Sequence, residues 1–80
     1  MGRERLQHLA VSETGFIFDP HSGRSYTVNS TGYSILQHLK SGLEKDEIVE
    51  KLIDEYEVSP AEAERDVIDF LEALKALHLT

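Results

Sequence analysis

The stretch that decides the fold is TGFIFDPHSGRSYTVNSTG, residues 14–32. Two short runs rich in aromatic and β-branched residues, 16–18 and 26–28, flank a segment with the composition of a reverse turn. Pro20 holds φ near about −65°, which suits the turn, and Gly23 can take a positive φ where the chain enters the second run. The pattern predicts a β-hairpin over this stretch.

The side chains of the two runs also predict how the hairpin pairs. With Phe18 opposite Tyr26 and Phe16 opposite Val28, these four side chains share one face of the hairpin, which we expect to be its core face. Ile17 then lies on the opposite, solvent-facing side. The turn chemistry also permits a shift of one residue, which would place the aromatic residues opposite serine and threonine.

The remaining elements follow from residue periodicity and capping signals. Residues 6–11 are too short for a helix, and part of them is expected to form a first strand that completes a three-stranded antiparallel meander. Capping residues 29–32 lead into a helix that ends at Ser41-Gly42, with Gly42 as the expected stop. A second helix is predicted over about residues 44–57, and Ser59-Pro60-Ala61-Glu62 marks the start of a third with an N-cap, an N1 proline and a capping box. The predicted fold class is α+β, a meander followed by three helices.

The third helix carries a continuous apolar face. Its members are Ala63, Val67, Phe70, Leu71, Leu74 and Leu77. Ile68 falls about 120° from the centre of that face by the 3.6-residue period, which makes it a candidate for lining a groove rather than the innermost core.

Composition limits the classes of function. The chain has 80 residues, no cysteine and a net charge of −7 at pH 7. This length predicts one domain over residues 1–80, and the lack of cysteine removes thiolate chemistry and fits a cytoplasmic protein. The acidic charge repels nucleic-acid phosphates, and no apolar run reaches the roughly 18 residues of a membrane span. Neither nucleic acid nor a membrane is an expected partner.

The residue types that carry catalysis and metal binding are present but scattered. His8, His21, His38 and His78 lie in four different segments with no i,i+3 or i,i+4 pair, so no zinc site is indicated. The carboxylates alternate with the apolar stripes as solvated helix faces do, and no serine lies in a Gly-x-Ser-x-Gly elbow. The sequence therefore predicts a binding protein with no catalytic residue, metal or cofactor.

The second hairpin strand offers a binding surface. Residues 24–28, RSYTV, contain no proline and no lysine, and in a simple meander they form an outer strand beside the third helix. Such an edge accepts an added strand, with main-chain hydrogen bonds for affinity and a groove for alternate side chains. The alternative is that Tyr26 and Val28 are ordinary core residues and that the N-terminal tail covers the edge.

Several motifs occur in one order along nearly the whole chain. They are Val11-Ser12-Glu13-Thr14-Gly15, the turn from Asp19-Pro20 to Gly23, Tyr26-x-Val28-Asn29-x-Thr31-Gly32, Ile35-Leu36, Gly42, Ile48, Leu52, Asp66-Val67, Phe70-Leu71 and Leu74. In this order and spacing the chain resembles the PqqD family, which is named after pyrroloquinoline quinone biosynthesis protein D and whose domain is also called the RiPP recognition element. Domains of this family are similar to a small winged helix-turn-helix.

The resemblance implies a peptide chaperone that binds the leader segment of a ribosomally made precursor peptide and presents it to a modifying enzyme, often a radical SAM protein. In the family the leader adds as a strand beside the third strand and against the third helix. Carried over to this chain, the implied peptide-binding residues are Arg24, Tyr26, Thr27 and Val28 on the strand and Val67, Ile68, Leu71 and Leu74 on the helix.

Three other functions compete with this interpretation. A DNA-binding winged helix would need basic residues on its recognition helix, but the third helix carries Arg65 and Lys75 among a larger number of acidic residues, which disfavours DNA. A carrier protein would need an Asp-Ser-Leu attachment site, and the nearest candidate is Lys40-Ser41-Gly42-Leu43. The remaining alternative is a winged-helix-like interaction or regulatory module with another protein ligand.

Overall fold

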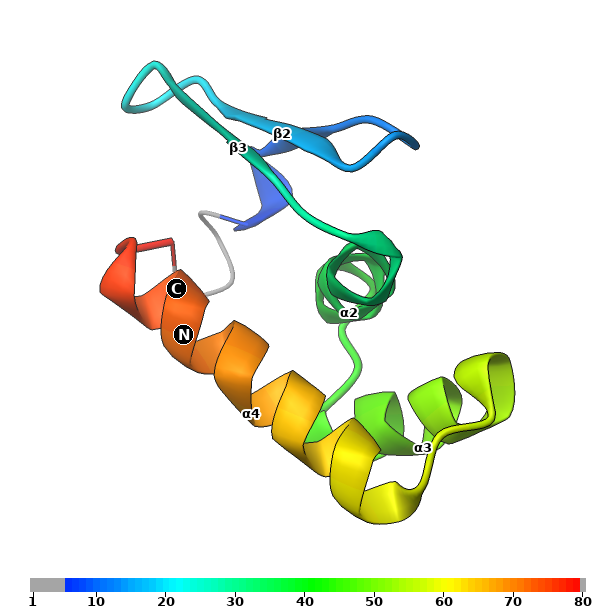
Figure 1. Cartoon of the computed structure of the whole chain (residues 1–80). Helices are drawn as coiled ribbons and strands as arrows, with labels where there is room; N and C mark the ends of the chain where they lie inside the picture. Colours follow the sequence, from blue (N-terminus) through cyan, green and yellow to red (C-terminus); the bar gives the residue numbers. More distant parts are fainter. Residues whose placement is uncertain (1–5, 80) are drawn as a thin grey trace.

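The computed structural model describes residues 6–79, in which a three-stranded antiparallel sheet precedes three helices (Figure 1). The strands are β1 (Ala10–Val11), β2 (Phe16–Asp19) and β3 (Arg24–Thr27), in the order β1-β2-β3 across the sheet. The helices are α2 (Ser30–Lys40), α3 (Lys45–Tyr56) and α4 (Pro60–Ala76). The predicted α+β class is confirmed, whereas the likeness to a winged helix-turn-helix remains a prediction.

Helices α2 and α4 begin where their capping residues predict. The Asn29 side chain accepts a hydrogen bond from the Gly32 backbone N–H at 2.8 Å and caps α2. The Ser59 side chain accepts from the Glu62 N–H at 3.2 Å, with Pro60 at the first position of α4. Each of these bonds satisfies a backbone donor that a helix N-terminus leaves without an intrahelical partner.

The N-terminal segment differs from its prediction. The predicted first strand is confirmed at Ala10–Val11, whereas Leu6 and Gln7 are helical, so the expectation that residues 6–11 hold no helix was wrong. Leu6 and Leu9 are both buried, because a turn of helix brings residues three apart to the same side. Gln7 Nε2 donates to the Lys40 carbonyl at 2.7 Å, and Lys40 Nζ donates to the Leu9 carbonyl at 3.0 Å. These bonds hold the segment against the end of α2.

The predicted hairpin register was wrong by one residue. The observed pairs are Phe16 with Thr27, Ile17 with Tyr26, Phe18 with Ser25 and Asp19 with Arg24. Ile17 is therefore the buried apolar residue of β2, and the side chains of Phe16 and Phe18 lie on the outer face, where they are 49% and 40% exposed. The aromatic residues lie opposite serine and threonine, as in the shifted register that the turn chemistry permits.

Asp19 fixes the pairing of β2 with β3 at the turn between them. Its side chain is 1% exposed, and its carboxylate accepts hydrogen bonds from the His21 N–H at 3.0 Å and the Ser22 hydroxyl at 2.9 Å. Its own carbonyl accepts from the Gly23 N–H at 2.8 Å. Because Asp19 organises the turn in this way, it becomes the last paired residue of β2, and the loop contains residues 20–23.

Gly15 fixes the pairing at the opposite end of the hairpin, where β2 begins and β3 ends. It has φ = +89°, and a Cβ atom at this position would lie 2.4 Å from the carbonyl oxygen of Val28. The Val28 N–H donates to the Gly15 carbonyl at 2.8 Å. Only glycine combines this backbone conformation with so close an approach, so Gly15 fixes which residue of the second strand it meets.

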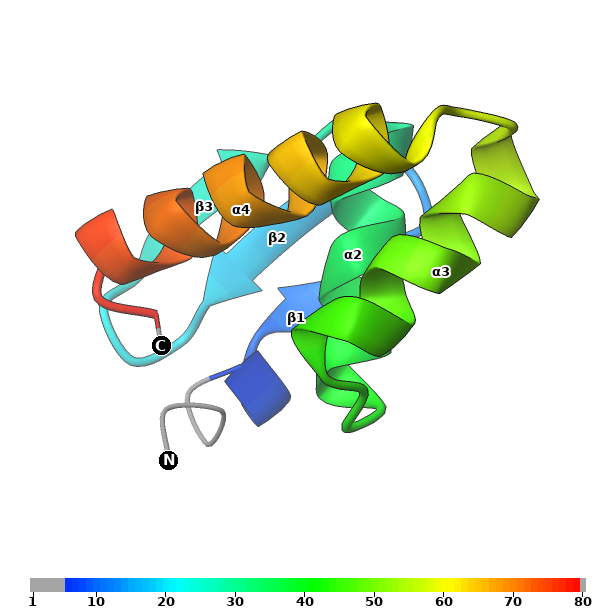
Figure 2. The ribbon, with the colours of Figure 1, turned by 90° about the horizontal axis from the view of Figure 1, so that it is seen from below.

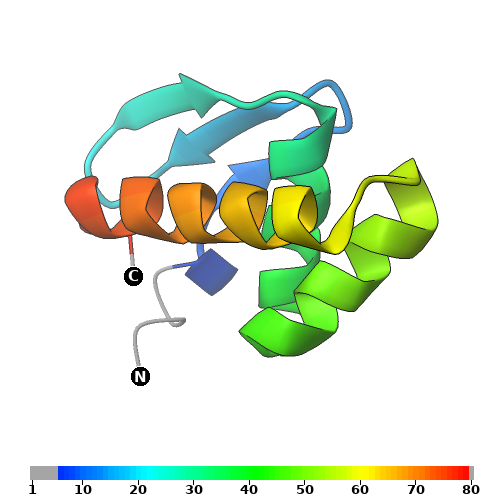
Figure 3. The same ribbon diagram turned by 60° about the horizontal axis from the view of Figure 1, so that its bottom comes forward.

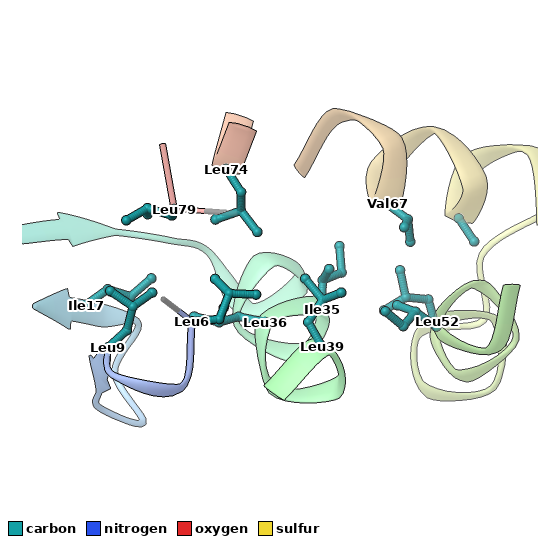
Figure 4. Packing of buried hydrophobic residues seen from close by; sticks show 12 residues of the cluster. Leu6, Leu9, Ile17, Ile35, Leu36, Leu39, Leu52, Val67, Leu74 and Leu79 are labelled. Carbon is teal, nitrogen blue, oxygen red and sulfur yellow. The ribbon is translucent and has the colours of Figure 1, made fainter. Parts of the chain in front are cut away.

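The hydrophobic core runs from beneath the sheet to the helical end of the molecule, with α2 in the middle (Figure 4). Ile35, Leu36 and Leu39 of α2 are buried in it. At the sheet end the buried residues are Leu6, Leu9, Ile17, Leu74 and Leu79, and at the helical end they are Ile48, Leu52, Ala63 and Val67. Phe70, which the apolar stripe places in the core, is only partly buried at its margin.

Candidate functional site

β3 is an edge strand that runs alongside the C-terminal half of α4 in the opposite direction (Figures 2 and 3). Within residues 6–79, no Cα atom of β3 lies within 8 Å of a Cα atom of α4. The described part of the N-terminal segment packs against the end of α2 and does not cover this edge. Residues 1–5, which belong to the alternative of a covering tail, lie outside the described residues.

The hydrogen-bond pattern shows which backbone groups of β3 face outward. In an antiparallel pair, opposite residues alternate between those that exchange hydrogen bonds and those that do not. The Val28 N–H donates to the Gly15 carbonyl, which places these two residues at a hydrogen-bonded position of the register. Tyr26 with Ile17, two residues further along, is therefore the next hydrogen-bonded pair. Ser25 and Thr27 fall in the pairs between. Their N–H and C=O groups therefore point away from β2, toward the open edge.

A cavity of about 340 Å³ occupies the space between β3 and α4. Its walls are mostly apolar side chains from the strand, the helix and the C-terminal residues. They are Ile17, Tyr26, Thr27, Val28, Asn29, Gly32, Phe70, Ala73, Leu74, Leu77 and Leu79. We call this cavity the apolar end of the groove.

A second cavity of about 320 Å³ continues the groove toward the start of α2. It shares Asn29, Gly32, Phe70 and Ala73 with the first. Its other walls are Thr31, Ile35, Asp66 and Asp69, and we call it the acidic end of the groove.

Gly32 keeps the two ends connected. A Cβ atom on Gly32 would lie 3.1 Å from Cε1 of Phe70 and 3.1 Å from Cβ of Val28. The missing side chain therefore lets α2 approach both walls of the groove without filling it.

The structure brings together half of the sequence-predicted site. Tyr26, Thr27, Val28 and Leu74 line the apolar end of the groove. Arg24 is exposed at the start of β3, on the same face as Tyr26 by strand alternation but outside both cavities. Val67 is completely buried in the core, and neither Ile68 nor Leu71 lines a wall of the groove. Tyr26 and Val28 also pack partly on the core, as the alternative interpretation expects.

Sequence reasoning missed the helix residues that form most of the groove wall. Phe70, Ala73 and Leu77 line it, and their spacing of i, i+3 and i+7 is the signal that could have identified them. The apolar stripe contains Phe70 and Leu77, but it does not distinguish a groove wall from the core. Ile68, the predicted groove residue, lies about 160° around the helix from Phe70.

Two other properties bear on function. Within residues 6–79, no three or more His, Cys, Asp or Glu side chains gather as a set of metal ligands. None of the helices in the same part of the chain is both long and apolar enough to cross a membrane.

An open sheet edge beside an apolar groove, in a small α+β domain, is the arrangement to which an extended peptide can add as a strand. The chain belongs to the PqqD family: the family model for coenzyme PQQ synthesis protein D matches residues 14–79. A comparison with curated protein sequences finds no match.

Two solved structures share the fold. One is a lasso peptide synthetase B1 complexed with the leader peptide, with 31% sequence identity and a TM-score of 0.75 over 88% of this chain and 84% of that one. The other is TbiB1 in complex with the TbiA(beta) leader peptide, with 29% identity and a TM-score of 0.79 over 89% of this chain and 84% of that one. Both similar proteins are thus recorded as complexes with leader peptides.

Proposed function

We propose that this protein is a non-catalytic peptide chaperone that binds the leader segment of a ribosomally synthesised precursor peptide. The segment adds to β3 as a fourth strand and places alternate side chains in the groove against α4. The observation that carries this proposal is the pair of outward-facing residues Ser25 and Thr27 on an open edge beside the apolar cavity. The two leader-peptide complexes of the same fold support it.

Energy estimates indicate that hydrogen bonds alone would not hold the segment. The four outward backbone groups of Ser25 and Thr27 contribute about 0.5–1.5 kcal/mol per hydrogen bond. Ordering a flexible segment costs about 2–5 kcal/mol, which offsets most of that gain. Each buried leucine-sized side chain adds about 1.5–3 kcal/mol. Binding therefore depends on apolar side chains that enter the groove.

The proposal includes a partner enzyme, because capture alone does not change the precursor. The bound leader would hold the rest of the precursor near a modifying enzyme such as a radical SAM protein, in the cytoplasm where the precursor is made. The role of this chain is to bind and present, with no catalytic residue, metal or cofactor of its own.

The proposal is tested by recording amide chemical shifts while synthetic leader segments of short precursor peptides encoded beside its gene are added. We expect shifts at residues 24–28 and along residues 70–77. Thr27→Pro is the matched variant, since it removes a donor from the open edge. A folded protein whose shifts do not respond to any such segment, or respond only on α3, would contradict strand addition and favour another protein ligand.

A further inference from the structure

We propose that the groove selects leader segments by charge as well as by apolar fit. It would hold a lysine or arginine at its acidic end and an apolar side chain four residues later at its apolar end. This inference rests on the proposed function, because it specifies which peptide the same site takes up.

The two ends of the groove differ in chemistry. None of the described residues that line the apolar end is charged, whereas Asp66 and Asp69 both line the acidic end. Neither carboxylate forms an ion pair or a side-chain hydrogen bond with another described residue. By comparison, Glu64 of the same helix lies 3.7 Å from Lys45. Asp66 and Asp69 are thus available to a cation that enters the groove.

The N-terminus of α2 opens onto the same end but does not cancel this charge. A helix N-terminus is equivalent to roughly half a positive charge, and two carboxylates carry about two negative charges at neutral pH. The Asn29 side chain also accepts a hydrogen bond from the Gly32 N–H, so this donor at the N-terminus of α2 is already used. The net charge of the acidic end therefore stays negative and favours a basic side chain.

The other end of β3 carries the opposite charge. Arg24 is exposed and lies on the groove face of the strand. A segment with its basic residue beside Asp66 and Asp69 avoids Arg24, whereas the reversed placement would bring like charges together. The charge along the groove therefore changes from positive beside the start of β3 to negative at the acidic end.

The helix sets the spacing between the two side chains. Asp66 and Leu74 are eight positions apart, and so are Asp69 and Leu77. Eight residues of α-helix extend about 12 Å, and an extended strand covers this length in about four residues. Four is an even number, so both side chains of the added strand face the groove.

The order of the two side chains follows from the strand direction. Both pairs of strands in this sheet are antiparallel, and an antiparallel segment on β3 starts at the acidic end, beside Asn29. The basic residue then precedes the apolar one. The expected pattern is Lys or Arg, three residues of any kind, and then an aliphatic or aromatic residue.

The test uses a phage-displayed library of random dodecapeptides as the probe, selected on the wild type and on Asp69→Lys. Glu72→Lys is the matched control, because Glu72 is exposed on the same helix, lines neither cavity, and its reversal gives the same net charge of −7 + 2 = −5. We expect the wild type and Glu72→Lys to enrich the basic-to-apolar pattern. Asp69→Lys leaves the Asp66 carboxylate beside one ammonium group, so it should lose the enrichment of Lys or Arg at the basic position. It should also bind wild-type-selected peptides about twofold to fivefold more weakly, as an exposed ion pair allows.

The outcomes separate this inference from the proposed function. Peptides that bind the wild type but not Thr27→Pro, with no charge preference or with the reverse order, would overturn the inference and leave strand capture standing. Failure of the wild type to select any peptide in a Thr27-dependent way would overturn both. If Asp69→Lys melts at a lower temperature than the wild type, Asp69→Asn replaces it, and loss of the basic preference is the expected result.

Discussion

The two halves of α4 use one apolar stripe in opposite ways. In the N-terminal half, Ala63 and Val67 are completely buried against the other helices. In the C-terminal half, Leu74 is still buried in the core, but Phe70 is only partly buried and Leu77, the C-cap residue, is 41% exposed beside the groove. The stripe continues without a break, so the sequence does not mark where the covered half ends. Periodicity identifies which face is apolar, but not whether the protein itself covers it.

The physical difference is what lies opposite each half. The N-terminal half packs directly on α3, whereas the C-terminal half faces a sheet whose last strand has an open edge. An added strand would lie about 4.8 Å from β3, in the place where the next strand of a larger sheet would be. We call the N-terminal half of α4 the closed half and the C-terminal half the open half. The closed half should therefore govern folding, and the open half should govern peptide binding.

Leu52→Ala should have the largest effect on stability, and it should separate the role of the closed half in folding from the role of the open half in binding. Leu52 of α3 is 1% exposed in the core at the closed half. Its truncation leaves a cavity and should lower the free energy of unfolding by about 2–5 kcal/mol, as measured by urea denaturation. Peptide affinity of the folded fraction should stay unchanged. A loss below about 1 kcal/mol would show that this half is not the principal core.

Gly32→Val should lower both the stability of the fold and the affinity for peptide. The new side chain would meet Phe70 and Val28, whose nearest atoms lie 3.1 Å from an added Cβ. Overpacking of this kind costs about 1–3 kcal/mol of stability, and the side chain should obstruct the groove and abolish most peptide binding. Calorimetric titration with a leader segment measures the affinity, and unchanged affinity would show that the peptide lies elsewhere.

Phe70→Ala should show that this ring belongs to the open half. A fully buried phenylalanine would cost about 3–5 kcal/mol on truncation. Because Phe70 is only partly buried, we expect about 1–2 kcal/mol, together with at least a tenfold loss of peptide affinity, which is about 1.4 kcal/mol. A thermal melt combined with a binding titration separates the two quantities. A full core-sized loss of stability would place Phe70 in the closed half instead.

Thr27→Pro should have the smallest effect on stability, below about 1 kcal/mol, because its N–H points away from β2. Peptide affinity should still fall about tenfold, since the added strand loses a donor and meets the proline ring. Tyr26→Pro is the matched control: its N–H belongs to the hydrogen-bonded pair with Ile17, so it should lower stability instead. Equal stability losses in the two variants would contradict the assigned alternation.

The sequence predicts the helices well because their signals are local. Asn29 and Ser59 cap helices at the positions where they occur, and the observed bounds follow. The hairpin register could not be predicted in this way, because β2 has apolar side chains on both faces. The register depends instead on the buried carboxylate of Asp19 and on the close approach of Gly15 to Val28. Neither feature can be recognised before the strands are in place.

The strand wall of the groove could be predicted, but the helix wall only in part. Tyr26 and Val28 follow from the position of an edge strand and lie where expected. On α4, the helical position of Ile68 suggested a groove residue, yet the groove is lined by Phe70, Ala73 and Leu77. The angle at which α4 crosses the sheet decides which side of the stripe stays open, and that angle comes from packing against α2 and α3.

The most direct test of strand addition is amide hydrogen exchange at β3, measured by NMR with and without a bound leader segment. In the free protein, Tyr26 and Val28 should exchange slowly and Ser25 and Thr27 rapidly, because only the first two amides donate to β2. When the segment binds, the amides of Ser25 and Thr27 should become protected while those of Tyr26 and Val28 stay as they were. Binding that leaves Ser25 and Thr27 in rapid exchange would contradict the account.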